Sequence, residues 1–495
     1  MKKKSDISYF IIFGLFVFTI MFLFFTVLNP LEVYDADDWL YIAQLRKPIP
    51  MIHVWNPTRV FPETAMPAVS YFGALVINPI INNYCRSLTL AHGLFASMVF
   101  TIYFVQFAVL FYKRKFATAK TSIAYGCLFI LLHFISHIYR GSNNYFMIGA
   151  INLTCFYYYV LSMIINAILV MHFMSYGGIK KWFNESNLPH KLIVAFWTYF
   201  CINSNLFSSV VLATYVGVEL LLNLINDIKA KEFDLKKYCT ANWLNLILII
   251  CWFGANILET TGGRADNIHK NFILNIPIVT AYAVASIVAK NVFVTILDLV
   301  VFISWFKLHG KKLNDTALKF VVIIGFGILY LIMLSASSEP SYMLRTEVSI
   351  CSLFFLFMGM IACLNELIKT NSKYKRAPLI LLGTLVLFFI FPGRILNSYN
   401  YSNITYEKSE ALMNDVINQF KEAEEKGQTE LVLEIPKFNE GGNWPVSVET
   451  IGDRYSSALY RHKIIKSEIK VKDIIVTEEK NEKYGIPEER STGSF

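Results

Sequence analysis

Long runs of apolar residues, separated by short polar segments, dominate the first 396 positions of the chain. A helix that spans the hydrocarbon core of a bilayer needs roughly 20 consecutive apolar residues. Runs close to this length occupy residues 9–28, 88–111, 123–139, 150–174, 192–203, 206–225, 241–258, 291–306, 320–335, 348–368 and 379–396. The pattern predicts an α-helical polytopic membrane protein with about 11 transmembrane helices.

Lysine and arginine positions orient these helices, because cytoplasmic loops carry an excess of both residues. With a cytoplasmic N-terminus, basic residues gather in alternate segments: 113–120, 180–191, 229–237, 307–319 and 369–376. The alternation requires that two proline-containing apolar stretches, 66–81 and 276–289, lie at the interface or re-enter on the outer side. An odd number of spans then places the chain after residue 396 outside.

Two spans need a further decision. The Asn-Ser-Asn sequence at 203–205 interrupts an apolar stretch, and we interpret it as a tight outer hairpin, with one long kinked helix as the alternative. The run at 9–28 is longer than a signal-peptide core, and no small-residue cleavage site follows it. We therefore expect an uncleaved anchor.

The chain changes character at residue 397. Residues 397–495 hold 13 basic and 18 acidic side chains, a net charge of −5, which leaves +14 on residues 1–396. A helical pattern at 406–426, a strand at 430–435, a Gly/Asn/Pro loop at 439–445, a short helix near 454–460 and a strand near 469–476 predict a small α/β domain. We expect this domain to cap the outer face of the membrane domain 1–396, with its last residues frayed from Glu478 onward.

Composition excludes several classes of protein. The chain is 55% apolar and only 16% charged, whereas soluble domains carry about 25% charged residues, so a soluble multidomain enzyme is excluded. The basic excess of the membrane part indicates cytoplasmic loops rather than nucleic-acid binding. The eight cysteines are scattered and include no CxxC pair, so we expect neither a disulfide framework nor a zinc site.

The first outer loop, residues 29–87, carries the strongest chemical signal. Asp35, Asp37 and Asp38 fall within four residues and are followed by Trp39. Carboxylates this close to a membrane surface are costly unless water, a cation or a substrate compensates them. Neighbouring like charges also raise one another's pKa, which favours a proton-accepting role. The alternative is a solvated start of a loop.

This loop also carries a resemblance. An uncleaved first helix, an outer loop that opens with Asp-Asp, about eleven spans and an outer C-terminal domain resemble the GT-C class of membrane glycosyltransferases. Within that class, Asp37-Asp38-Trp39 followed by Trp55-Asn-Pro-Thr-Arg59 is similar to bacterial serotype-converting O-antigen glucosyltransferases. The local motifs cover only about residues 35–63.

The resemblance implies transfer of a sugar from a polyprenyl-phosphate carrier to an acceptor on the outer face. The base would be Asp38 or Asp37, with Asp35 in support, and cations would stabilise the leaving lipid phosphate. We expect substrate binding by residues of the outer segments: Trp39, Arg59, Glu63, Arg140, Arg264 and Arg345. Each arginine also has a purely structural interpretation. Arg345 would snorkel to the membrane interface, Arg264 would form a local ion pair in a turn, and Arg140 would only mark the end of a span.

The same resemblance implies the partners and the compartment. The expected donor carries glucose, the acceptor is the O-antigen of lipopolysaccharide, and the location is the bacterial inner membrane with the C-terminal domain in the periplasm. No cofactor is implied with certainty, although a divalent cation would be compatible with this chemistry. Two other functions remain open: an O-antigen polymerase or ligase, and a flippase or transporter of lipid-linked sugars. Transporters, however, tend to show internal repeats, and we find none.

Overall fold

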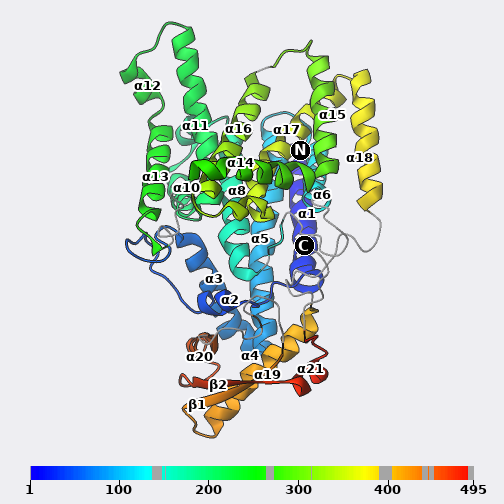
Figure 1. The fold of residues 1–495 in the computed structure, drawn as a ribbon. Coiled ribbons are helices and arrows are strands. Elements are labelled where there is room, and N and C mark those ends of the chain that lie inside the picture. The colour runs from blue at the N-terminus through cyan, green and yellow to red at the C-terminus, as the bar shows by residue number, and fades with distance from the viewer. Residues whose placement is uncertain are drawn as a thin grey trace.

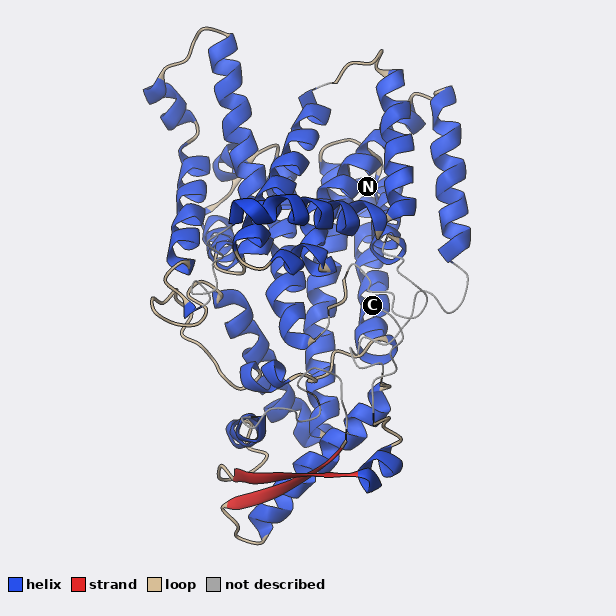
Figure 2. Ribbon diagram, in the orientation of Figure 1, coloured by secondary structure: helices blue, strands red, loops and turns tan. Residues whose placement is uncertain are grey.

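A computed structural model describes residues 2–136, 148–150, 152–263, 272–313, 315–389, 404–437, 444 and 451–488. Helices make up most of this part of the chain, and the two strands lie together at one end (Figure 2). The helices of the membrane part are α1 (Lys2–Leu23), α2 (Ala36–Tyr41), α3 (Val60–Phe72), α4 (Asn78–Ile81), α5 (Tyr84–Lys113), α6 (Ala119–Ile135), α7 (Leu153–Cys155), α8 (Ser162–Tyr176), α9 (Ile179–Glu185), α10 (Leu188–Ile202), α11 (Leu206–Lys229), α12 (Leu235–Ala241), α13 (Trp243–Glu259), α14 (Phe272–Val284), α15 (Val292–Leu308), α16 (Asp315–Ser337), α17 (Thr346–Lys369) and α18 (Arg376–Phe389).

The helical character predicted from the apolar runs is confirmed, because most described positions in each of the eleven predicted ranges are helical. The predicted number of spans is not reproduced by helix length. Within the described residues, eight helices are long and apolar enough to cross a membrane, or nine if the bent pair α12–α13 counts as one span. Helices α6, α10, α15 and α18 have 17, 15, 17 and 14 residues, at or below the roughly 17 that crossing requires.

Two of the eight, Val60–Ile81 and Phe272–Ala289, were expected not to cross. Both are long and apolar enough to cross, so their course relative to the membrane stays a prediction. The first begins where the Phe61 amide donates to the Asn203 carbonyl and ends beside the C-terminal residues, where Asn83 donates to Glu410. The second helix starts against α16 and ends where Lys290 donates to the Leu344 carbonyl, so both of its ends contact neighbouring residues of the chain.

The bundle has two distinct ends. At the end that carries α2 (the lower end in Figure 1), residues 54–63 meet residues 203, 259 and 263. At the opposite end, which carries α12, Lys319 pairs with Glu219 at 2.6 Å and Lys113 lies over the Tyr176 ring. The predicted outer segments at 54–63, 203 and 259–263 therefore lie at one end of the bundle.

The interrupted stretch 192–225 forms a hairpin of two helices, α10 and α11, as predicted. Asn205 caps α11 by accepting a hydrogen bond from the Phe207 amide, while Ser204 donates to the carbonyl of Cys201. Capping side chains satisfy amides that would otherwise be orphaned at the helix start. The turn lies at the α2 end, since Asn203 contacts Phe61.

The C-terminal segment, residues 404–488, contains the predicted elements: α19 (Tyr406–Glu425), β1 (Glu430–Pro436), α20 (Ile451–Arg461) and β2 (Lys470–Thr477). The strands pair in parallel, with α20 in the connection between them. The loop expected at 439–445 lies outside the described residues except for Trp444, which is buried and stacks on Tyr34.

One prediction for this segment is wrong. Residues 478–484 form helix α21 (Glu478–Tyr484) instead of fraying. Despite its dense charge, the helix is held by the Tyr484 hydroxyl, which donates to Asp415 of α19, and by the buried side chain of Asn481, which donates to the Lys437 and Ile486 carbonyls.

Candidate functional site

Asp38 lies in a fully enclosed socket between α2 and α7. One carboxylate oxygen, Oδ1, accepts from the amide and the hydroxyl of Thr154, each at 2.6 Å. The other, Oδ2, accepts from the amides of Tyr34 and Asp35 at 3.0 Å and of Leu153 at 3.3 Å. Asp38 is 0% exposed. It therefore binds the start of the helix Leu153–Tyr176 as an anion binds a helix N-terminus.

The environment of Asp38 contains opposing electrostatic effects. Burial, and then the nearby Asp35 carboxylate, raise the pKa of Asp38 to about 7. All five neighbouring groups are donors, however, and donors favour the ionised form. The carboxylate thus fits the socket best when charged, and its lone pairs are already engaged. This geometry suits a positioning residue better than a group that must receive a proton.

Asp37 and Asp35 are more accessible. Asp35 caps α2, since its Oδ1 accepts from the Asp37 amide at 3.0 Å. The Asp37 side chain is 55% exposed and pairs with Arg454 of α20, with 3.3 Å between Oδ1 and Nη1. Of the three predicted carboxylates, Asp37 is the one that solvent and a substrate can reach most directly.

A cationic group lies immediately beside the acidic one. The Arg345 guanidinium approaches the sulfur of Cys155 at 4.0 Å, and Cys155 directly follows Thr154, which holds Asp38. Arg345 lies over the Tyr342 ring, is one-third exposed, and has its nearest carboxylate, Glu347, at 3.9 Å. Arg345 thus contacts the residue that follows Thr154, whose amide and hydroxyl hold Asp38.

Lys290 adds a second positive charge here that the sequence did not single out. Its Nζ donates to the carbonyl of Leu344, the residue before Arg345, at 2.7 Å. Burial lowers the pKa of Lys290, and the carboxylate of Glu347 opposes this effect. The signal that could have found Lys290 is its place directly after an apolar segment that was expected to lie on the outer side.

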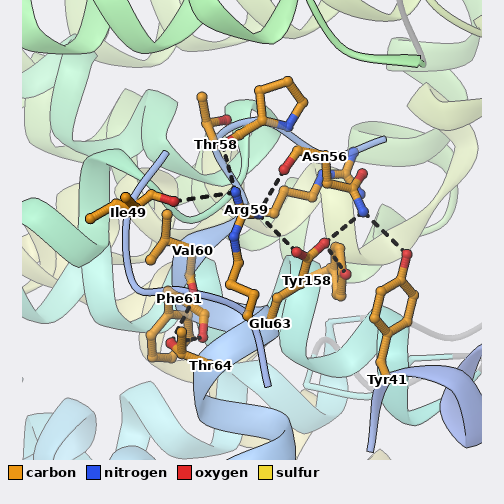
Figure 3. Close-up of polar contacts among 12 residues, drawn as sticks. Tyr41, Ile49, Asn56, Thr58, Arg59, Val60, Phe61, Glu63, Thr64 and Tyr158 are labelled. Atoms are coloured by element: carbon orange, nitrogen blue, oxygen red, sulfur yellow. Dashed lines mark hydrogen bonds and ion pairs between the residues drawn. The ribbon is translucent and has the colours of Figure 1, made fainter. Parts of the chain in front are cut away.

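Arg59 and Glu63 lie in a second, internally balanced polar network (Figure 3). Glu63 is buried and accepts from Arg46 at 2.8 Å, from Asn56 at 2.6 Å and from the Tyr158 hydroxyl at 2.7 Å. Figure 3 shows Asn56 and Tyr158 pointing toward the Glu63 carboxylate, with Tyr41 accepting from Asn56.

Arg59 is likewise engaged within the protein. Its Nε lies 3.8 Å from Glu259, and its guanidinium lies over the Tyr158 ring. Thr58 completes this contact by donating its hydroxyl and its amide to Glu259. The arginines of this network each face a carboxylate, so these residues shape the first segment and have little capacity left for a substrate.

Trp39 faces the C-terminal segment. Its ring meets Tyr455 of α20 edge-on at 4.5 Å, and it is 1% exposed. Arg454 and Arg461, also from α20, contact Asp37 and the Ala43 carbonyl. These contributions come from more than 400 positions away in the chain, so no local pattern could have indicated them.

Arg140 and Arg264 lie outside the described residues. Within the described ranges, no group of three or more His, Cys, Asp or Glu side chains is arranged to hold a metal ion. Comparisons with protein-family models, with curated proteins and with solved structures found no match.

Proposed function

We propose that this protein transfers a sugar from a polyprenyl-phosphate carrier to lipopolysaccharide O-antigen on the periplasmic face of the bacterial inner membrane. Glucose is the expected sugar, and the proposal places the chain in the GT-C architecture. One observation carries it: Asp38 binds Thr154 while Arg345 contacts the next residue, Cys155. An acidic and a cationic group thus share one helix start at the end of an apolar bundle.

Such a transfer needs a proton acceptor and a stabiliser of negative charge. Asp37, one residue before Asp38, takes the proton of an acceptor hydroxyl, whose oxygen attacks the anomeric carbon. The bond between that carbon and the phosphate oxygen breaks, and the lipid phosphate leaves with the bonding electrons. Arg345 and Lys290 would stabilise the phosphate charge.

The proposal gives the aspartates different roles, which their exposure and contacts support. Asp37 is the exposed carboxylate and serves as the base in this proposal. Asp38 holds α2 against α7, the short helix that contains Cys155. This refines the expectation that either residue could be the base.

The test is transfer by the purified full chain in liposomes. The donor is labelled polyprenyl-phosphate-glucose and the acceptor is O-antigen oligosaccharide, assayed with and without EDTA to measure dependence on divalent cations. Asp37→Asn should abolish transfer, while the matched exposed acid Asp473→Asn on β2 should leave it unchanged.

Other results of this assay would indicate one of the alternative functions. Growth of the product by whole repeat units would indicate a polymerase. Movement of the labelled lipid between leaflets without transfer would indicate a flippase. Absence of transfer with glucose, mannose, galactose and N-acetylglucosamine donors in well-folded protein would refute the proposal.

A further inference from the structure

Helices α2 and α20 lie side by side where the first outer segment meets the C-terminal segment (Figure 1). A cavity of about 250 Å³ is lined by Trp39, Leu40, Ala43 and Gln44 from α2 and the residues that follow it, and by Asp453, Arg454, Ser457 and Ala458 from α20. The alanines and Trp39 are buried at its base, and Gln44 and Asp453 are exposed at its rim. The cavity is therefore open to solvent.

We propose that this cavity is the acceptor subsite and that it binds one sugar residue of a neutral, hydroxyl-rich chain. The inference rests on the proposed function, which it deepens by naming where the acceptor lies and which residues select it. Its location supports it: Arg454 lines the cavity and also pairs with Asp37, so a sugar in the cavity lies next to the proposed base.

The lining matches hydroxyl chemistry. The Gln44 amide and the Ser457 hydroxyl can both donate and accept, as sugar hydroxyls do. The indole N–H of Trp39 is buried and has no hydrogen-bond partner among the described residues. A buried donor without a partner is costly, and Trp39 is among the residues that line this cavity.

The charge of the cavity lining favours a neutral sugar over the phosphate group of the donor. Arg454 is balanced by Asp37, and Asp453 adds a further negative charge at the rim. A lining without excess positive charge disfavours an anionic phosphate and accommodates a neutral saccharide. The two cations proposed to stabilise the phosphate, Arg345 and Lys290, lie instead beside Cys155 and Leu344.

The experiment measures binding of the acceptor alone. The probe is neutral O-antigen oligosaccharide, one to three repeat units released from lipopolysaccharide, titrated calorimetrically into the full chain in nanodiscs without donor. Ser457→Leu, which fills the cavity, should weaken binding at least tenfold, and Gln44→Ala, an exposed position that cannot unfold the core, should weaken it several-fold. Tyr460→Ser, on α20 but outside the cavity, is the control and should bind as the native chain does.

The outcomes separate this inference from the function on which it rests. No binding by the native chain, or equal binding by native, Ser457→Leu and Gln44→Ala proteins, would overturn the subsite. Binding that both variants weaken supports the subsite even if no donor supports transfer, in which case only the proposed reaction fails. In a transfer assay, the variants should raise the KM for acceptor and leave the KM for donor unchanged.

Discussion

Replacing Asp38 by asparagine tests whether this carboxylate positions the site or reacts. The substitution keeps the shape of the side chain and changes one acceptor oxygen into an NH₂ donor. If the NH₂ group replaces Oδ1, both donors of Thr154 lose their acceptor; if it replaces Oδ2, the amides of Tyr34, Asp35 and Leu153 lose theirs. Two or three buried donors are thus left unsatisfied in either orientation.

The magnitude follows from that count. Each buried donor without a partner costs about 1–3 kcal/mol, so two of them predict a loss of roughly 2–6 kcal/mol from the free energy of unfolding. Asp37→Asn removes only an exposed ion pair, worth about 1 kcal/mol at most. Asp38→Asn should therefore lower stability strongly, and Asp37→Asn should lower activity with little change in stability.

Hydrogen exchange and thermal unfolding of the two variants in the same detergent provide the measurement. In Asp38→Asn, amide protection should fall at residues 34–38 and 153–154, together with the midpoint of unfolding. Loss of transfer in Asp38→Asn with native protection and a native midpoint would refute the positioning role and make Asp38 a reacting group.

Three further predictions concern other parts of the site. Arg345→Ala should lower kcat/KM for the lipid donor about 10- to 100-fold, because a charge-assisted hydrogen bond contributes about 1.5–3 kcal/mol; unchanged donor kinetics would place the phosphate elsewhere. Arg46→Ala leaves the Glu63 carboxylate buried without its ion pair and should cost about 3–5 kcal/mol in chemical denaturation, whereas Lys47→Ala, its exposed neighbour, should be neutral. Burial lowers the pKa of His462 from 6.5 to about 4, so its unfolded form binds more protons and stability should fall by up to about 3 kcal/mol as pH drops from 6.5 to 4. His462→Gln should flatten that part of the stability profile, and an unaltered pH slope in this variant would contradict the assignment.

The features that could be predicted from the sequence are those that depend on residues close together in the chain. Apolar run length located the helices, whereas the orientation drawn from the alternation of charge stays a prediction. Three aspartates within four residues marked the acidic part of the site. The same reasoning could not distinguish Asp38 from Asp37, because the local sequence predicts that both side chains are exposed. Only the packing of residues 153 and 154 against Asp38 buries one of them.

Contacts between distant residues lay beyond the sequence. Arg59 and Glu63 appeared available for substrate because their partners, Glu259 and Arg46, showed no pattern that linked them. Lys290 reaches the site only because its helix ends beside Leu344. Residues 478–484 appeared too highly charged to be ordered, yet Asp415 of α19 accepts from Tyr484 and holds them.

The contact between Asp37 and Arg454 joins residues 417 positions apart, and this has a consequence for synthesis. Ribosomes add about 5–20 residues per second, so the acidic segment exists for roughly 20 to 80 s before its last partner has been made. During that interval Thr154 can already hold Asp38, but the side of α2 that later meets α20 stays uncovered. A nascent chain that terminates just after α18 would contain every bundle helix and still lack one wall of the site.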